Sequence, residues 1–117
     1  MKLIRSIGYA LAGIGSFFKQ DRNGQIQLVV ALASITAGWL LQIPPTHWMI
    51  LIACITAVLS LEMVNASLEK LCDLVEPSIH PQIKLIKDLA AGAVLLAAIA
   101  SVIIGFFLFL PAVRHLL

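Results

Sequence analysis

A stripe of polar side chains in an otherwise apolar segment is the feature of this sequence best suited to chemistry. Its members are spaced by three, four and four residues, and they are Glu62, Asn65, Glu69 and Asp73. Side chains at these spacings share one face of an α-helix. If that helix begins near Trp48, fourteen residues of helical rise place Glu62 about 21 Å along it, below the cytoplasmic headgroups. An ionisable side chain at such a depth marks a functional site, unless the stripe serves only to join helices through hydrogen bonds.

A lysine–aspartate pair, Lys87 and Asp88, opens the last apolar segment, and the small residues at 90–93 follow closely. Small residues allow close helix packing, which would bring the pair against the acidic stripe. Carboxylates hold Mg²⁺ and a lysine neutralises phosphate, so this combination suits a nucleotide. Taken alone, the pair would be read as a cytoplasmic anchor that reaches to the interface. The sequence has no glycine-rich phosphate-binding loop, so a nucleotide site would need a different architecture.

The composition indicates a chain that is solvated largely by lipid. Of its 117 residues 61% are hydrophobic and 12% are charged, whereas soluble domains have about 45–50% and 25%. The net charge of +2 is too small to indicate nucleic-acid binding, and we expect no nucleic-acid partner. Cys54 and Cys72 lack the spacing of a metal site or a disulfide framework.

We therefore expect an all-α integral membrane protein, with residues 1–117 forming a single domain. Apolar periodicity in the first twenty residues, with basic residues at both ends, is typical of an amphipathic helix lying in the membrane interface. Uncharged stretches separated by proline-containing turns predict three transmembrane helices. The expected ranges are 1–20 for the surface helix and 24–43, 46–75 and 82–113 for the spans, the last closed by Pro111 and Arg114.

The distribution of charge predicts the orientation. Seven of the eight Lys and Arg residues lie near the N-terminus or the second loop, and only Arg114 lies on the other side. By the positive-inside rule the N-terminus is cytoplasmic. All six acidic residues also lie on that side, which the rule does not require. We expect a multi-pass protein of the bacterial inner (cytoplasmic) membrane with its functional groups at the cytosolic face.

These motifs resemble those of the small prokaryotic diacylglycerol kinase and undecaprenol kinase family. The resemblance rests on E-M-V-N-A-S-L-E-K-L-C-D at 62–73, H-P at 80–81 and K-D-L-A-A-G-A-V at 87–94, and it extends over essentially the whole chain. It implies an ATP-dependent lipid kinase that uses Mg²⁺ and assembles as a homotrimer with active sites shared between subunits. The first expected substrate is diacylglycerol, which would become phosphatidic acid. The alternative is undecaprenol, which would become undecaprenyl phosphate.

The resemblance also implies roles for individual residues. Glu62 would be the general base for the lipid hydroxyl, and Asn65 would help to position the reacting groups. Glu69 and Asp21 would be the metal ligands. The implied ATP-binding residues are Tyr9, Asp21, Glu69, Ser78, Ile79, His80, Lys87 and Asp88. The implied lipid-substrate residues are Lys2, Glu62 and Ala91.

Two positions depart from the family pattern. Asp21 stands where Glu is usual, and its side chain is one methylene shorter. Ala66 stands where Thr or Ser is commoner, so a hydroxyl is missing there.

Two other classes of function are open from the residues alone. One is a small ion or proton transporter subunit with Glu62 as its intramembrane site, which would place carboxylates near the bilayer midplane. The other is a structural subunit whose polar stripe specifies assembly, which gives Lys87 and Asp88 no role.

Overall fold

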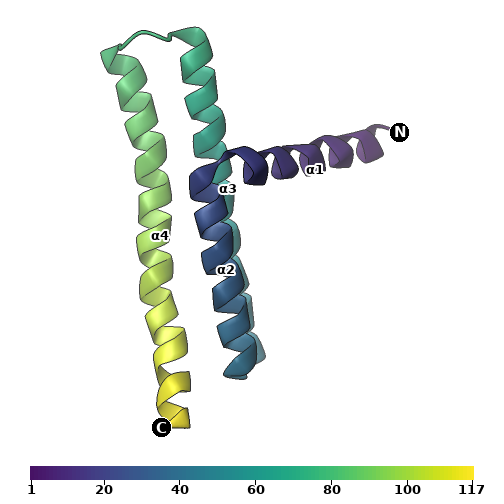
Figure 1. Cartoon of the computed structure of the whole chain (residues 1–117), viewed down its shortest axis with the longest axis vertical. Helices are drawn as coiled ribbons and strands as arrows, with labels where there is room; N and C mark the ends of the chain where they lie inside the picture. Colours follow the sequence, from purple (N-terminus) through teal and green to yellow (C-terminus); the bar gives the residue numbers. More distant parts are fainter.

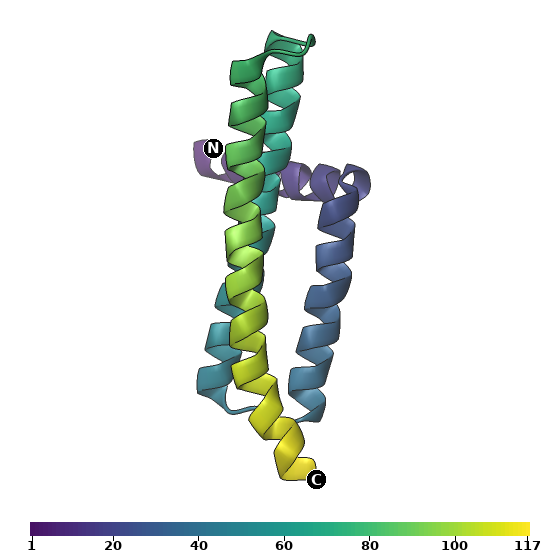
Figure 2. The same ribbon diagram turned by 90° about the vertical axis from the view of Figure 1, so that its left-hand side faces the viewer.

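The computed structural model describes residues 1–117 as four α-helices without a β-strand. The helices are α1 (Lys2–Gln20), α2 (Arg22–Leu40), α3 (Pro45–Val75) and α4 (Pro81–Leu116). Figure 1 shows α2, α3 and α4 running alongside one another, whereas α1 projects sideways from them. α3 packs along α4 and, less extensively, along α2. In the rotated view of Figure 2, α4 lies in front of α3 and α2 stands to the right of them. The expectation of an all-α protein is confirmed.

α3 and α4 are long and apolar enough to cross a membrane. The 36 residues of α4 rise about 54 Å, close to the 55 Å length of the molecule and well beyond a hydrocarbon core of roughly 30 Å. α2 is less apolar because its first turns carry Arg22, Asn23 and Gln25. Only 11 of the 117 residues are buried, so lipid or neighbouring subunits must cover the exposed apolar side chains.

The corner between α1 and α2 is fixed by reciprocal capping. The backbone N–H of Gly24 donates to Oδ2 of Asp21 at 2.8 Å, which caps α2. The Gln25 side-chain amide donates to the carbonyls of Phe18 and Lys19 at 3.0 and 3.1 Å, which caps α1. The ring of Phe17 lies directly over Gly24, where a Cβ atom would overlap it. Because Asp21 caps it, α2 begins at Arg22, two residues before the expected bound.

α2 ends at Leu40, three residues earlier than expected, in a Schellman motif. The N–H of Ile43 donates to the carbonyl of Gly38 at 3.1 Å, and Gln42 takes the left-handed position with φ 54°. Ile43 also precedes Pro44, and the residue before a proline is disfavoured in helical conformation. Pro45 then occupies the first position of α3, where its missing N–H costs nothing.

α4 continues through Pro111 to Leu116, although we expected it to close near residue 113. A proline removes one helical hydrogen bond, but an apolar segment in lipid has no water with which to satisfy its backbone in another form. At the other end, Nδ1 of His80 accepts from the N–H of Gln82 at 3.1 Å and caps the helix. α4 therefore begins at Pro81 rather than at residue 82.

Candidate active site

Glu62 and Asn65 are the two buried polar side chains of the chain, with exposed fractions of 3% and 6%. Both come from the stripe on α3, one helical turn apart. A charge buried at this level is costly unless other groups compensate it. The surroundings of Glu62 therefore decide what this position can do.

The neighbours of Glu62 come from the start of α2. Its carboxylate interacts with the side chains of Asp21 and Asn23, and Glu69 lies further along α3 within electrostatic reach. Carboxylates that share a site repel one another, which favours the binding of a proton or a cation among them. Oδ1 of Asn65 is buried without a hydrogen-bond partner. An unsatisfied buried oxygen beside a carboxylate is a free acceptor for a hydroxyl that enters the site.

Asp21 has a structural task as well as a place beside Glu62. Its Oδ2 caps α2, which leaves Oδ1 for another partner. Glu69 is exposed and belongs to neither of the two ion pairs of the chain.

The side chains near Glu62 could supply only some of the ligands that Mg²⁺ needs. The chain contains no cluster of three or more side chains able to hold a metal ion. Mg²⁺ in nucleotide sites takes one or two carboxylates and obtains its other ligands from phosphates and water. Asp21 and Glu69 match that requirement in number and in type.

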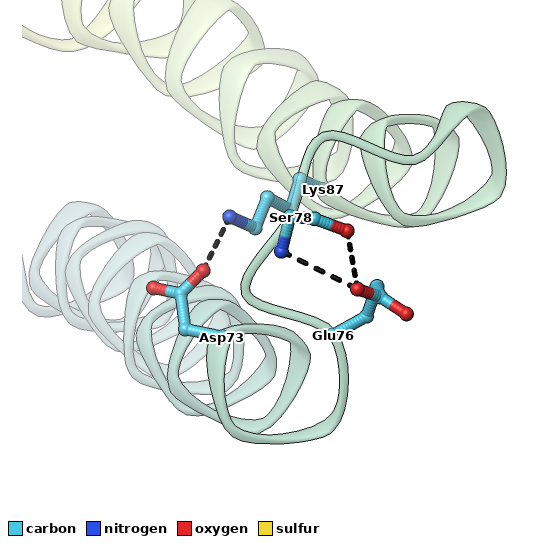
Figure 3. A network of polar contacts seen from close by, with 4 residues as sticks. All are labelled: Asp73, Glu76, Ser78 and Lys87. Atoms are coloured by element: carbon cyan, nitrogen blue, oxygen red, sulfur yellow. Dashed lines mark hydrogen bonds and ion pairs between the residues drawn. The ribbon is translucent and has the colours of Figure 1, made fainter.

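Lys87 links α4 to the acidic stripe of α3. Its Nζ lies 2.6 Å from Oδ1 of Asp73, as Figure 3 shows, and Glu69 is within its electrostatic reach. One turn earlier, Nζ of Lys84 lies 2.6 Å from Oδ2 of Asp88. Both side chains of the Lys84–Asp88 pair are exposed, so the pair contributes less than about 1 kcal/mol and can open for a ligand.

The loop between α3 and α4 is held by its own side chains. The hydroxyl and the N–H of Ser78 both donate to the carboxylate of Glu76 (Figure 3). Ile79 is fully exposed, and His80 caps α4. Beside Lys87, this loop forms a polar edge at the same end of the bundle as Asp73.

Several expected site residues lie apart, in the single chain, from Glu62 and its neighbours Asp21, Asn23, Asn65 and Glu69 (the Glu62 group). Residues 78–80 lie beyond the end of α3, which is thirteen residues or about 20 Å of helix past Glu62. Tyr9 precedes Asp21 by twelve residues, which is about 18 Å along α1, and Lys2 is more distant still. Tyr9 is 75% exposed, and Ala91 is exposed on α4. A single chain therefore does not bring all the expected residues together.

Sequence reasoning missed Asn23 as a member of the site. A polar residue in the first turn of an apolar helix reads as a solvated helix end, and nothing in its spacing points to α3. Only the corner between α1 and α2 brings it to Glu62.

Comparison with known proteins places this site in a family. The model of the prokaryotic diacylglycerol kinase family matches residues 8–109. The chain is 36% identical to an undecaprenol kinase of Bacillus subtilis over 94% of its own length and 89% of the relative's. It is 42% identical to a diacylglycerol kinase of Synechocystis over 98% of its length and 66% of the relative's.

A more distant relative is a diacylglycerol kinase of Escherichia coli, 27% identical over 87% of this chain and 84% of that protein. The family match spans parts of all four helices and includes every residue of the Glu62 group. The chain belongs to the prokaryotic diacylglycerol kinase family.

Proposed function

We propose that the protein is an ATP-dependent lipid kinase that phosphorylates diacylglycerol to phosphatidic acid. One observation carries the proposal: a buried carboxylate, Glu62, lies within an apolar helix beside Asp21, Asn23 and the unpaired amide oxygen of Asn65. A lipid hydroxyl reaches this depth from the bilayer, and a nucleotide approaches from the cytosol. The relatives named above are lipid kinases, which supports the same reaction type here.

In this proposal Glu62 accepts the proton of the lipid hydroxyl as the hydroxyl oxygen forms its bond to the γ-phosphorus and ADP leaves. Asn65 helps to position the reacting groups beside Glu62. Phosphoryl transfer depends mainly on such positioning and on charge neutralisation. Glu62 also contacts the lipid substrate, together with Lys2 and Ala91.

Asp21 and Glu69 would hold Mg²⁺, which neutralises charge on the phosphates of ATP when it is bound. Lys87 and Asp88 bind ATP by exchanging their partners within the chain for the nucleotide. The other proposed ATP contacts are Tyr9, Ser78, Ile79 and His80.

The proposed assembly is a homotrimer in the bacterial inner membrane. α2 is the third span, since its 19 residues rise about 28 Å and it lies alongside α3. α1 lies in the interface as an amphipathic helix, and the N-terminus is cytoplasmic. Neighbouring subunits supply the residues that one chain leaves apart, such as Tyr9.

Undecaprenol is the second candidate substrate, because the Bacillus subtilis relative carries that name and covers nearly the whole chain. Both lipids present a hydroxyl at the interface and bury apolar tails. A transporter role for Glu62 is less well supported, because the relatives named above are kinases.

The test is a competition assay with purified protein in lipid. Radiolabelled ATP, Mg²⁺ and equal amounts of diacylglycerol and undecaprenol are supplied, and the initial rates of both phosphorylated products are compared. We expect phosphatidic acid to form faster. Faster formation of undecaprenyl phosphate reverses the choice of substrate, and the absence of both products refutes the lipid kinase.

A further inference from the structure

A cavity of about 270 Å³ lies between the last turns of α1 and the middle of α3. Small side chains on both walls keep it open. Its α3 wall is formed by Met63, Ala66, Ser67 and Lys70, and its other wall by Gly13, Ser16, Phe17, Gln20 and Asp21. Because Asp21 belongs both to this wall and to the neighbours of Glu62, the cavity borders the proposed active site.

Lys70 is the only basic side chain that lines the cavity. Its Nζ donates to Oε1 of Gln20 at 3.0 Å. The two ion pairs of the chain use Lys84 and Lys87, so Lys70 has no carboxylate partner. Two of the three donors on its ammonium group have no partner in the chain.

The position of Lys70 suits a phosphate. It follows Glu62 by eight residues, or about 12 Å of helix, toward the cytosolic end of α3. It follows Glu69, a proposed metal ligand, directly in sequence. Its flexible stem can turn the ammonium group along the cavity, toward Asp21. A cation beside carboxylates that hold a metal neutralises charge that the metal alone leaves on a polyphosphate.

We propose that Lys70 binds the phosphate group that is transferred, contacting the γ-phosphate of ATP at the cytosolic end of the cavity between α1 and α3. The assignment rests on the proposed kinase function and adds a residue that the family motifs leave unassigned. The hydrogen bond that the ammonium group donates to Gln20 holds it in place until the nucleotide arrives.

A structural role for Lys70 is the competing explanation. Its hydrogen bond to Gln20 joins α3 to the last turn of α1 and would stabilise the corner even if no phosphate were bound. The two explanations differ in what removal of Gln20 does. Gln20→Ala breaks the tether but leaves the cation, whereas Lys70→Gln removes the cation.

The experiment measures kcat and KM for ATP at saturating lipid for Lys70→Gln, Lys70→Arg, Gln20→Ala and Lys19→Gln. Lys19→Gln is the matched control, since it makes the same change in charge at the end of α1 and does not line the cavity. We expect Lys70→Gln to lower kcat/KM for ATP about 10- to 100-fold, the effect of one charged hydrogen bond to phosphate. Lys70→Arg should recover most of the loss, Gln20→Ala should lose clearly less than Lys70→Gln because it keeps the cation, and Lys19→Gln should stay near wild type.

The thermal unfolding temperature of each variant is measured in the same lipid, together with inhibition by added phosphatidic acid. Equal losses in Lys70→Gln and Gln20→Ala, with lowered unfolding temperatures, would overturn the assignment in favour of the tether. Unchanged kinetics for ATP with weakened inhibition by phosphatidic acid would also overturn it, because the contact would then be to the lipid phosphate. A wild-type protein that phosphorylates no lipid refutes the kinase itself, whereas an active wild type with a normal Lys70→Gln variant refutes only this assignment.

Discussion

Glu62→Gln isolates the chemistry of the buried carboxylate from its packing. The substitution keeps the size and shape of the side chain but removes its negative charge and its ability to accept a proton. Glu62 is 3% exposed, so bulk water has no access with which to replace the lost base. General-base catalysis contributes about 10²- to 10⁴-fold, and we expect kcat to fall by that factor.

The same substitution should not weaken the fold. It removes the repulsion between the carboxylates of Glu62 and Asp21, and the new amide group can donate to Asp21. We therefore expect a thermal unfolding temperature equal to or above that of the wild type. A variant that loses activity while gaining stability is the signature of a functional charge held against its own repulsion.

The assay measures initial rates of lipid phosphorylation at saturating ATP and lipid, with thermal unfolding in the same preparation. Glu62→Asp serves as the comparison, since it keeps the carboxylate but withdraws it by one methylene. It should retain more activity than Glu62→Gln. Turnover by Glu62→Gln within about tenfold of the wild type, in a folded protein, would show that no proton passes to this residue in the rate-limiting step.

Three further predictions concern the elements that position the site. Asp21→Asn keeps the side-chain oxygen that caps α2 but removes the negative charge. The Mg²⁺ concentration for half-maximal activity should therefore rise, while the thermal unfolding temperature stays unchanged. A wild-type Mg²⁺ requirement would show that Asp21 is not a metal ligand. Gly24→Ala forces a Cβ into the ring of Phe17 and should cost about 1–3 kcal/mol of stability. Phe17→Ala removes a buried ring and is itself destabilising, so the double variant should lose less than the sum of the two single losses. Thermal unfolding of Gly24→Ala at the wild-type temperature would contradict this contact. Gln42→Gly removes the strain of a side chain in the left-handed backbone conformation and should stabilise the protein by about 1 kcal/mol. The measurement is unfolding in denaturant, and activity should be unchanged. A loss of stability would show that contacts of the Gln42 side chain stabilise the protein by more than its backbone strain costs.

The sequence predicted the helical stripe on α3 because its spacing is a local property of one helix. It could not predict which residues of the stripe are buried and which are exposed. Glu62 and Asn65 are buried, whereas Glu69 and Asp73 are exposed beyond the corner where α1 meets α2. Which residues are buried depends on where α1 ends and α2 begins. The periodicity of the α3 sequence carries no information about that position.

Pairings between helices were harder still to predict. Small residues on α4 indicated close packing against acidic residues, and the structure does pair Lys87 with α3, but at Asp73 and not at Glu62. The contribution of Asn23 depends on the capping at Asp21, which sets the direction of α2. The early end of α2 depends on a left-handed residue that is not glycine, an uncommon choice that composition does not reveal.

The distribution of charge within the chain explains how a nucleotide could bind without a glycine-rich loop. The carboxylates of Asp21 and Glu69 both act on that of Glu62, and none of the three belongs to an ion pair, so together they disfavour a bare polyphosphate and favour an added cation. Lys70, which follows Glu69 directly, has no carboxylate partner, whereas Lys84 and Lys87 on α4 are held by other acids in exposed pairs that water already screens. On the proposed function, Lys84 and Lys87 leave these weak ion pairs when Mg²⁺ and ATP bind, and contact phosphate instead. Neither lysine has to be buried for this exchange. On that function we expect the site to prefer a nucleotide with bound metal, because the metal compensates the carboxylates and the phosphates compensate the lysines.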